Sequence, residues 1–544
     1  MTKLLLILMM LIMLPGAQAS AQEAPTAILL SEDSITVDGG EIGSDPSSAV
    51  YLALQAETHE DVPEQLRTLR NRVVTITAAG TYHISGTASD AQIAVRAGAE
   101  DEVRLVLDGA HLSCRTAPAI AVYSARDTRI PGEYGVTIEL AQGSENTITG
   151  SHTVAEDDDG IEFDGAIGAQ VSLGFEGSGS LMVEADNEGI EVASGHMTIN
   201  GGVFDIQAGD DPLNVSEDGV GVLTVNGGNL YSAVKPLPGG EGDGIDSNGY
   251  IIFNGGTVIN LAHPTSQDGG IDSDMGSVIN GGVIVGAGNM YDPIEADSAQ
   301  LFMMLEFTEA TSDLVVVTDQ QGKAVFAYDF PYDYKYIAFS TPELQEGVYH
   351  VYLGGEIEGE AENGLYTRID SYVPGRQMTH GGASAQQGMN KGGFGFGFGF
   401  GFGGRQPQEA PEGMEAPPEI PEGTQWPEGM EVPPEIPEGT QWPEGMEAPS
   451  EIPEGAQWPE GMEAPPEIPD WMQGRDGMNG FDPGARERRN DWGKGWNGDR
   501  GGMNGGFGGG FGGPRGMESS AAVATGDFYL SKDNTGFTNL TAIQ

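Results

Sequence analysis

The sequence has few basic residues. Only 24 of its 544 residues are Lys or Arg, against 82 that are Asp or Glu, so the formal charge at pH 7 is −58. Binding to phosphate needs clustered Lys and Arg, and nucleic acid is therefore excluded as a partner. The single cysteine, Cys114, excludes an internal disulfide and a thiolate zinc cluster, and we expect it to be a small core residue.

Long apolar runs are also scarce. One such run, Leu4 to Leu14, follows Lys3 and precedes the small-residue pattern Ala17-Gln18-Ala19. It is too short to cross a bilayer, so residues 1–21 are predicted to be a signal peptide that directs the protein to the outside of the cell, either free or attached to the cell surface. No other segment is apolar enough to predict a transmembrane span.

Familiar catalytic motifs are missing as well. The sequence shows no Ser/His/Asp pattern, no Gly-rich phosphate loop and no haem motif. Five histidines, which are isolated from one another in the sequence, are expected to be surface or packing residues: His83, His111, His152, His196 and His263.

What the sequence does contain is a repeat. An acidic turn recurs at 159–162, 187–191, 210–214, 243–246, 269–272 and, in weaker form, 292–295. Between these turns lie β-branched or aliphatic strands broken by Asn-Gly-Gly, with asparagines at Asn200, Asn226, Asn254 and Asn280, spaced 26, 28 and 26 residues apart. A fixed period of this size predicts a solenoid, and strands without helical periodicity predict a parallel β-helix. Gly and Asn are expected at its corners because a sharp bend needs positive φ.

Several ordered motifs resemble one bacterial family. They are TITAAGTYHISGT (75–87), LVLDGA (105–110), APAI (117–120), GSENTI (143–148), GSGSL (177–181) and the acidic-turn and Asn-Gly-Gly units. Over residues 27–370 the chain resembles the secreted carbohydrate-binding β-helix proteins typified by a clostridial cellulose- and pectin-binding protein. The resemblance implies a right-handed parallel β-helix of pectate-lyase-like shape, bound calcium, and affinity for plant-type polysaccharide without cleavage. The chain departs from the family pattern in a charged, helix-like insertion at 49–71 and in two turns with Asp-Pro in place of Asp-Gly, at 211–214 and 292–295.

The acidic turns predict calcium from their own chemistry. Residues 156–297 hold 25 acidic residues and one basic residue, Lys235, and stacked turns would bring carboxylates to roughly 5 Å from one another. Calcium takes six to eight oxygen ligands in flexible geometry, which suits two stacked turns. The alternative is that Asp-Gly only makes good turns. The best candidate ligands are Asp243, Asp246, Asp268, Asp272 and Asp274, followed by Asp210, Asp211, Asn214 and Asp159.

Three rival functions stay open. A calcium-dependent, pectate-type polysaccharide lyase needs a base, and Lys235 is the candidate, although a lone surface-loop lysine is the plainer interpretation. A hydrolase with paired carboxylates is not excluded. A structural cell-surface or matrix protein would use calcium for stability alone. We expect a non-catalytic protein that binds cellulose or a pectin-like acidic polysaccharide.

The chain is expected to have five parts. After the signal peptide, 22–300 form the carbohydrate-binding β-helix and 301–375 a β-rich cap, whose aromatic residues either pack or form a platform for sugars. Residues 376–520 are a disordered Gly/Pro-rich region with a 16-residue repeat that ends in Trp426, Trp442 and Trp458, either a spacer or a multivalent binding arm. Residues 521–544 regain strand character and are expected to dock onto the cap.

Overall fold

The protein is all-β in the computed structural model. The structure describes residues 24–55, 66, 69–153, 161–380, 382–384 and 526–543, and within these ranges every regular element is a strand. No helix in the described part of the chain is long and apolar enough to cross a membrane. The expected signal peptide, nearly all of the 376–520 region and most of the predicted helix at 63–70 lie outside the described residues. The start of the expected insertion is a strand, β4 (Val50–Leu54).

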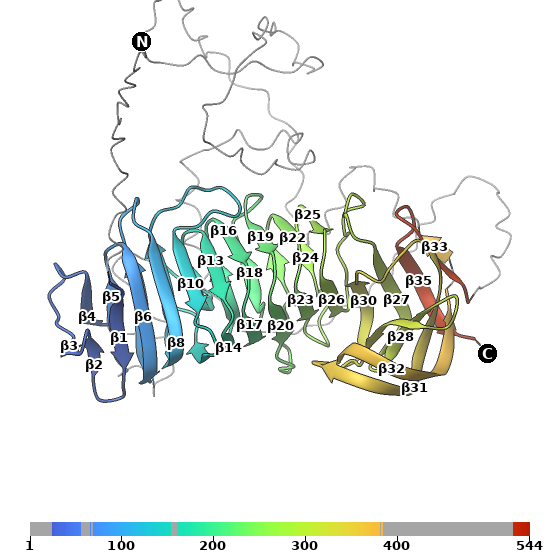
Figure 1. Ribbon diagram of the computed structural model, residues 1–544, viewed down its shortest axis with the longest axis horizontal. Helices are drawn as coiled ribbons and strands as arrows, with labels where there is room; N and C mark the ends of the chain where they lie inside the picture. Colours follow the sequence, from blue (N-terminus) through green and yellow to red (C-terminus); the bar gives the residue numbers. More distant parts are fainter. Residues whose placement is uncertain are drawn as a thin grey trace, which may run out of the picture. The chain divides into compact units, whose positions relative to one another are not determined.

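Three ladders of mainly parallel strands make up the first part of the fold (Figure 1), and one strand of each recurs in every repeat. The first ladder runs β1 (Thr26–Leu30), β6 (Gly80–Ala88), β8 (Val103–Ser113), β10 (Val136–Leu140), β13 (Leu173–Gly177), β16 (His196–Ile199), β19 (Val222–Val225), β22 (Tyr250–Phe253) and β25 (Gly276–Ile279). The second continues from the end of β8 through β11 (Glu145–Gly150), β14 (Ser180–Ala185), β17 (Val203–Ala208), β20 (Asn229–Val234), β23 (Thr257–Leu261) and β26 (Val283–Gly288).

The third ladder carries the acidic turns. It runs β5 (Arg72–Ile76), β7 (Ala91–Arg96), β9 (Ile120–Ser124), β12 (Gly165–Ala169), β15 (Glu188–Val192), β18 (Leu213–Val215), β21 (Asp246–Ser247) and β24 (Asp272–Ser273), all parallel, with β4 antiparallel at its start. Side chains of Ile, Val, Leu and Phe from all three ladders meet in one continuous core, in which Leu223, Val225 and Ile279 are fully buried. Cys114 is buried among them, as expected.

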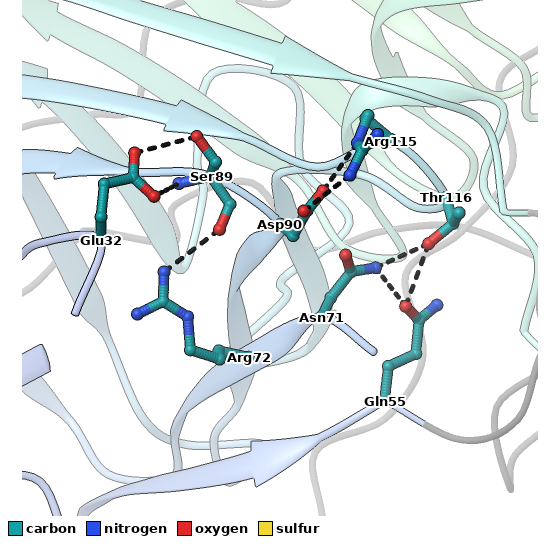
Figure 2. A network of polar contacts seen from close by, with 8 residues as sticks. All are labelled: Glu32, Gln55, Asn71, Arg72, Ser89, Asp90, Arg115 and Thr116. Atoms are coloured by element: carbon teal, nitrogen blue, oxygen red, sulfur yellow. Dashed lines mark hydrogen bonds and ion pairs between the residues drawn. The ribbon is translucent and has the colours of Figure 1, made fainter. Parts of the chain in front are cut away.

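A polar network stabilises the N-terminal end of the core (Figure 2), where β2 (Ile35–Val37) and β3 (Gly40–Glu41) also pair. Arg115 makes two hydrogen bonds of 2.8 Å to the carboxylate of Asp90. The fully buried Asn71 donates to the Thr116 hydroxyl at 2.7 Å and also to the Gln55 side chain. The bonds from Asn71 satisfy its buried amide nitrogen, whereas the Arg115–Asp90 pair is partly exposed, and both join segments that are distant in the sequence.

The Asn-Gly-Gly corners form a side-chain ladder. Nδ2 of Asn280 donates to Oδ1 of Asn254 at 2.8 Å, Asn254 donates to Asn226 at 2.8 Å, and Asn226 donates to Asn200 at 2.7 Å. The expected positive φ lies at the second glycine, as in Gly228 (94°), while the asparagines keep negative φ. The prediction that Asn adopts the bend was therefore wrong. Asn is needed because its amide is both donor and acceptor, so identical side chains pair from coil to coil.

Antiparallel strands follow the three ladders. They are β27 (Phe302–Thr311), β28 (Val315–Asp319), β29 (Ala324–Tyr328), β30 (Tyr334–Ser340), β31 (Gly347–Glu362), β32 (Leu365–Thr379) and β33 (Gly382–Ser384). Strand β30 pairs antiparallel with both β26 and β27, and so continues the second ladder without a free edge. The aromatic residues of this part mostly pack: Tyr328, Tyr334 and Phe339 are fully buried.

The C-terminal strands join this part, as expected. Strand β34 (Phe528–Leu530) pairs with β31, and β35 (Gly536–Ala542) pairs with β27, β32 and β33. Figure 1 shows β35 beside β27 and β33. Phe528 and Phe537 are fully buried against each other, with ring centroids 5.1 Å apart.

Candidate functional site: a column of carboxylates

The third ladder places polar side chains in register on successive strands. Glu191 pairs with Asn214, Asn214 with Asp246, and Asp246 with Asp272. Neighbouring strands are about 4.8 Å apart, so these side chains stack at that spacing. We call this set, together with Glu188, Asp211, Asp243 and Asp292 from the adjoining turns, the carboxylate column.

The turns before these strands are held by carboxylates that accept backbone N–H groups of a neighbouring turn. Oδ1 of Asp211 accepts the N–H of Asp243 at 2.7 Å, and Asp243 in turn accepts the N–H of Gly269. Oδ2 of Asp268 accepts the N–H of Gly242, also at 2.7 Å. Gly242 has φ of 134°, and a Cβ on it would lie 2.7 Å from Asp210 Oδ1, so only glycine fits there. Turn formation is thus part of what these carboxylates do.

The electrostatics of these carboxylates differ from those of ordinary turn residues. Burial raises the pKa of Asp246 to about 7, and repulsion from Asp272 and Asp274 adds to the effect. Burial and the charge of Glu241 raise the pKa of Asp210 to about 6. The pKa values of Asp211 and Asp243 are also raised, first by burial and then by neighbouring aspartates. A turn needs no such concentration of like charge.

Three residues that sequence reasoning left out of the ligand set belong to the same column. Glu188 and Glu191 are buried, and burial raises the pKa of both. Asp292, in the weaker last turn, has a pKa raised by burial and by its hydrogen bond with Asp272, and accepts the N–H of Ser273. The sequence contains the pattern that identifies them, because all three residues lie in copies of the acidic turn. Two have Glu in place of Asp, and one lies in a turn with Asp-Pro in place of Asp-Gly.

Two acceptor atoms in the column have no hydrogen-bond donor. Asn214 donates through Nδ2 to Oε1 of Glu188 at 2.8 Å, which leaves its own Oδ1 and Glu188 Oε2 buried and without a donor. These side chains are only 7% and 8% exposed, respectively. Buried acceptors without a donor are costly, and a proton or a cation would satisfy them.

The remaining predicted residues lie near the column or outside the described chain. Asp274 is exposed at the edge, although burial and Asp272 raise its pKa. Asp159 lies outside the described residues. Among the described residues, no three His, Cys, Asp or Glu side chains converge as they stand into a ready metal site. The side-chain ammonium of Lys235 donates to the backbone carbonyl of Ala185 at 2.8 Å.

Of the five histidines, two are buried. His196 has neither ring nitrogen hydrogen-bonded to a side chain, and burial lowers its pKa. The His263 ring makes a hydrogen bond of 2.9 Å to the Leu237 carbonyl. Both are packing residues, and neither lies in a cluster of possible metal ligands.

Comparison with known proteins agrees with the sequence resemblance. Residues 70–302 match the family described as carbohydrate-binding domain-containing protein. A protein of that description from Acetivibrio thermocellus is 34% identical over 139 residues, which are 25% of this chain and 46% of the relative, so the chain spans about half of the relative's length. A solved structure of a polysaccharide lyase-like protein from C. thermocellum, a gadolinium derivative, has 23% identity and a TM-score of 0.32 over 48% of this chain and 94% of its own. Residues 70–302 therefore match the carbohydrate-binding domain-containing proteins, which is the family that the sequence motifs resemble.

Proposed function

We propose that this protein is a secreted, non-catalytic carbohydrate-binding protein that is stabilised by calcium and binds plant-type or acidic polysaccharide. The observation that carries the proposal is the family match over residues 70–302, which covers most of the three ladders. Secretion rests on the signal-peptide pattern of residues 1–21.

The strand order supports a right-handed parallel β-helix as the scaffold. Each repeat gives one strand to each ladder in the same order, as in β15–β16–β17 and then β18–β19–β20. A chain that returns to the same three parallel ladders in every repeat winds as a coil, and parallel crossovers are almost always right-handed.

The carboxylate column fits calcium by its donor set. It offers carboxylate and amide oxygens, two of them buried acceptors without a donor, and calcium prefers such oxygen ligands. The residues that would hold calcium ions are those of the column, namely Glu188, Glu191, Asp211, Asn214, Asp243, Asp246, Asp272 and Asp292, with Asp210, Asp268 and Asp274 at the margins. When bound, calcium would offset part of the negative charge of the column and would supply a cation to which a sugar carboxylate can bind. Without it, neighbouring ionised carboxylates 5 Å apart would repel by about 3 kcal/mol at an effective dielectric constant of 20.

The same argument favours an acidic glycan. A uronate polymer would be repelled by a bare acidic face, and a cation held by the protein changes the sign of the interaction. We therefore expect binding to polygalacturonate to require calcium.

A pectate-type lyase is the second candidate, and Lys235 is the reason to test it. Its ammonium group is hydrogen-bonded to the carbonyl of Ala185, and its backbone N–H to Ala208. A base that takes a proton from the substrate needs its nitrogen to face the substrate, and Nζ of Lys235 is instead directed at the carbonyl of Ala185. This geometry favours a positioning role for Lys235 within the coil.

The test is to incubate the purified protein with polygalacturonate in calcium and in chelator. Protein that sediments with the polymer reports binding, and ultraviolet absorbance of unsaturated product reports lyase activity. The proposal predicts binding in calcium, its loss in chelator, and no rise in absorbance.

Two other outcomes would contradict the proposal. A rise in absorbance that the Lys235→Ala variant abolishes would make the protein a lyase. Absence of binding to any glycan, with thermal stability still dependent on calcium, would make it a structural protein.

A further inference from the structure

A hollow lies where the last parallel coil meets the antiparallel strands. It is bounded by β27, β30 and β35, which lie side by side in Figure 1, and by the loop after β26. It is a shallow hollow that opens to solvent, with an accessible volume of about 30 Å³, so a ligand would lie against its surface rather than inside it. Its lining includes Tyr291, Glu306, Tyr336 and Thr538.

Two tyrosines form one wall. Tyr291 is 42% exposed, and its ring centroid is 5.1 Å from that of Tyr336. Both rings also line a second, smaller hollow of about 10 Å³, whose lining includes Asp292 of the carboxylate column. Large aromatic side chains that stay exposed in a concave site offer a flat apolar face to a ligand.

The polar groups beside the rings are held in place. The hydroxyl of Tyr336 donates to Glu306 Oε1 at 3.0 Å, and Lys335 Nζ lies 3.4 Å from the same oxygen. Lys335 Nζ is also 5.2 Å from the centroid of the Tyr336 ring. The cluster thus combines an aromatic face, a carboxylate acceptor and an ammonium donor with balanced charge.

We propose that Tyr291, Tyr336, Glu306 and Lys335 form a binding subsite for one pyranose unit of a neutral glycan. The apolar face of the sugar ring stacks on Tyr291, and its hydroxyls donate to Glu306 and accept from Lys335. A uronate is disfavoured because Glu306 already neutralises Lys335 and Asp292 lies in the adjoining hollow. The C-terminal strand β35 completes the site through Gly536, Phe537 and Thr538.

This subsite rests on the proposed function only in that the chain binds carbohydrate. It differs from the carboxylate column in charge and in ligands. Binding here should therefore persist in chelator and prefer neutral chains, whereas binding of polygalacturonate should need calcium.

The experiment measures binding of neutral cello-, xylo- and manno-oligosaccharides to the full protein by calorimetry in chelator. We expect at least one series to bind, Tyr291→Ala to weaken it by about tenfold or more, and Tyr291→Phe to retain most of the affinity because the ring remains. Glu306→Gln should weaken it less, because an amide oxygen still accepts. Tyr529→Ala, on β34 outside both hollows and with a side chain 57% exposed, is the matched control and should bind normally.

Circular dichroism melting of each variant separates a lost site from a lost fold. No binding of any neutral series, or equal binding by wild type and a folded Tyr291→Ala variant, would overturn the subsite. Neither result would affect calcium-dependent binding of polygalacturonate, so the two proposals fail separately.

Discussion

Two columns of repeated polar side chains lie along the same repeats of the fold. Stacked neighbours form hydrogen bonds in one column and repel one another in the other. In the asparagine ladder, Asn226 and Asn254 each donate to the asparagine of the preceding repeat and accept from that of the following repeat, with N···O distances of 2.7–2.8 Å. In the carboxylate column the ionised side chains can only accept, and burial together with mutual repulsion raises their pKa values. The spacing between successive strands is the same for both columns. The difference in hydrogen bonding between the columns therefore comes from the chemistry of the side chain.

The comparison shows what an amide can do that a carboxylate cannot. A primary amide has both donors and acceptors, so a stack of identical residues satisfies itself. The ladder is also closed at one end, where Asn200 donates to the hydroxyl of Tyr134 at 2.9 Å and Tyr134 donates to Glu176 at 2.7 Å. A stack of carboxylates needs protons or cations from outside. The first column is complete by itself, and the second is suited to a ligand.

The largest expected effect on melting temperature is that of removing calcium with a chelator, and this effect depends on pH. In chelator at about pH 8 we expect a melting temperature lower by about 3 °C or more than in calcium, since a ligand at a hundred times its Kd contributes about 2.7 kcal/mol. In chelator, lowering the pH from about 8 to about 5 should raise the melting temperature. The folded-state pKa values of Asp210 (about 6) and Asp246 (about 7) lie above their unfolded values, so this stability is fully present below the unfolded pKa and is lost as pH rises through the folded one.

Differential scanning calorimetry over this pH range, with and without calcium, measures both trends. In calcium the rise on acidification should shrink or reverse, because protons compete with the ion for the same oxygens. A melting temperature that is independent of chelator at every pH would contradict the assignment of the column to calcium.

A smaller effect, with a sign that depends on calcium, is expected for Asp246→Asn. In chelator the variant should be more stable than wild type by about 1–2 kcal/mol, because one charge leaves a repelling stack. In saturating calcium it should be less stable, because one anionic ligand is lost. Asp333→Asn, at an exposed position outside the column, is the control and should change little in either condition. The same sign of change with and without calcium would be evidence against a shared cation.

The smallest effect is expected in the asparagine ladder. Asn254→Asp keeps the bond from Asn280 but opposes two acceptors at Asn226, and should cost about 1 kcal/mol. Urea unfolding of this variant with and without calcium tests the contrast between the two columns. The loss should be the same in both conditions, and rescue by calcium would show that the ladder, too, can bind cations.

The repeat allowed much of the site to be predicted. The period of the acidic turns brought Asn214, Asp246 and Asp272 into one register, as the structure has them. The same logic reaches Glu188 and Glu191, which were passed over because glutamate replaces aspartate there. The role of the asparagines was missed, since the sequence shows only that Asn precedes two glycines and both a bend and an amide ladder are consistent with that.

By itself, the sequence determined the all-β class, the repeat that stacks like residues, and the negative charge concentrated on the acidic turns, because these follow from local pattern and period. Only the tertiary structure decided which oxygens lack donors, as at Glu188 and Asn214, and which aromatics stay exposed, as at Tyr291. It also placed Thr538 and Glu306 in the lining of one hollow, although they are more than two hundred positions apart in the sequence. Burial and hydrogen-bond satisfaction depend on every neighbour in space, and no local stretch of sequence contains those neighbours.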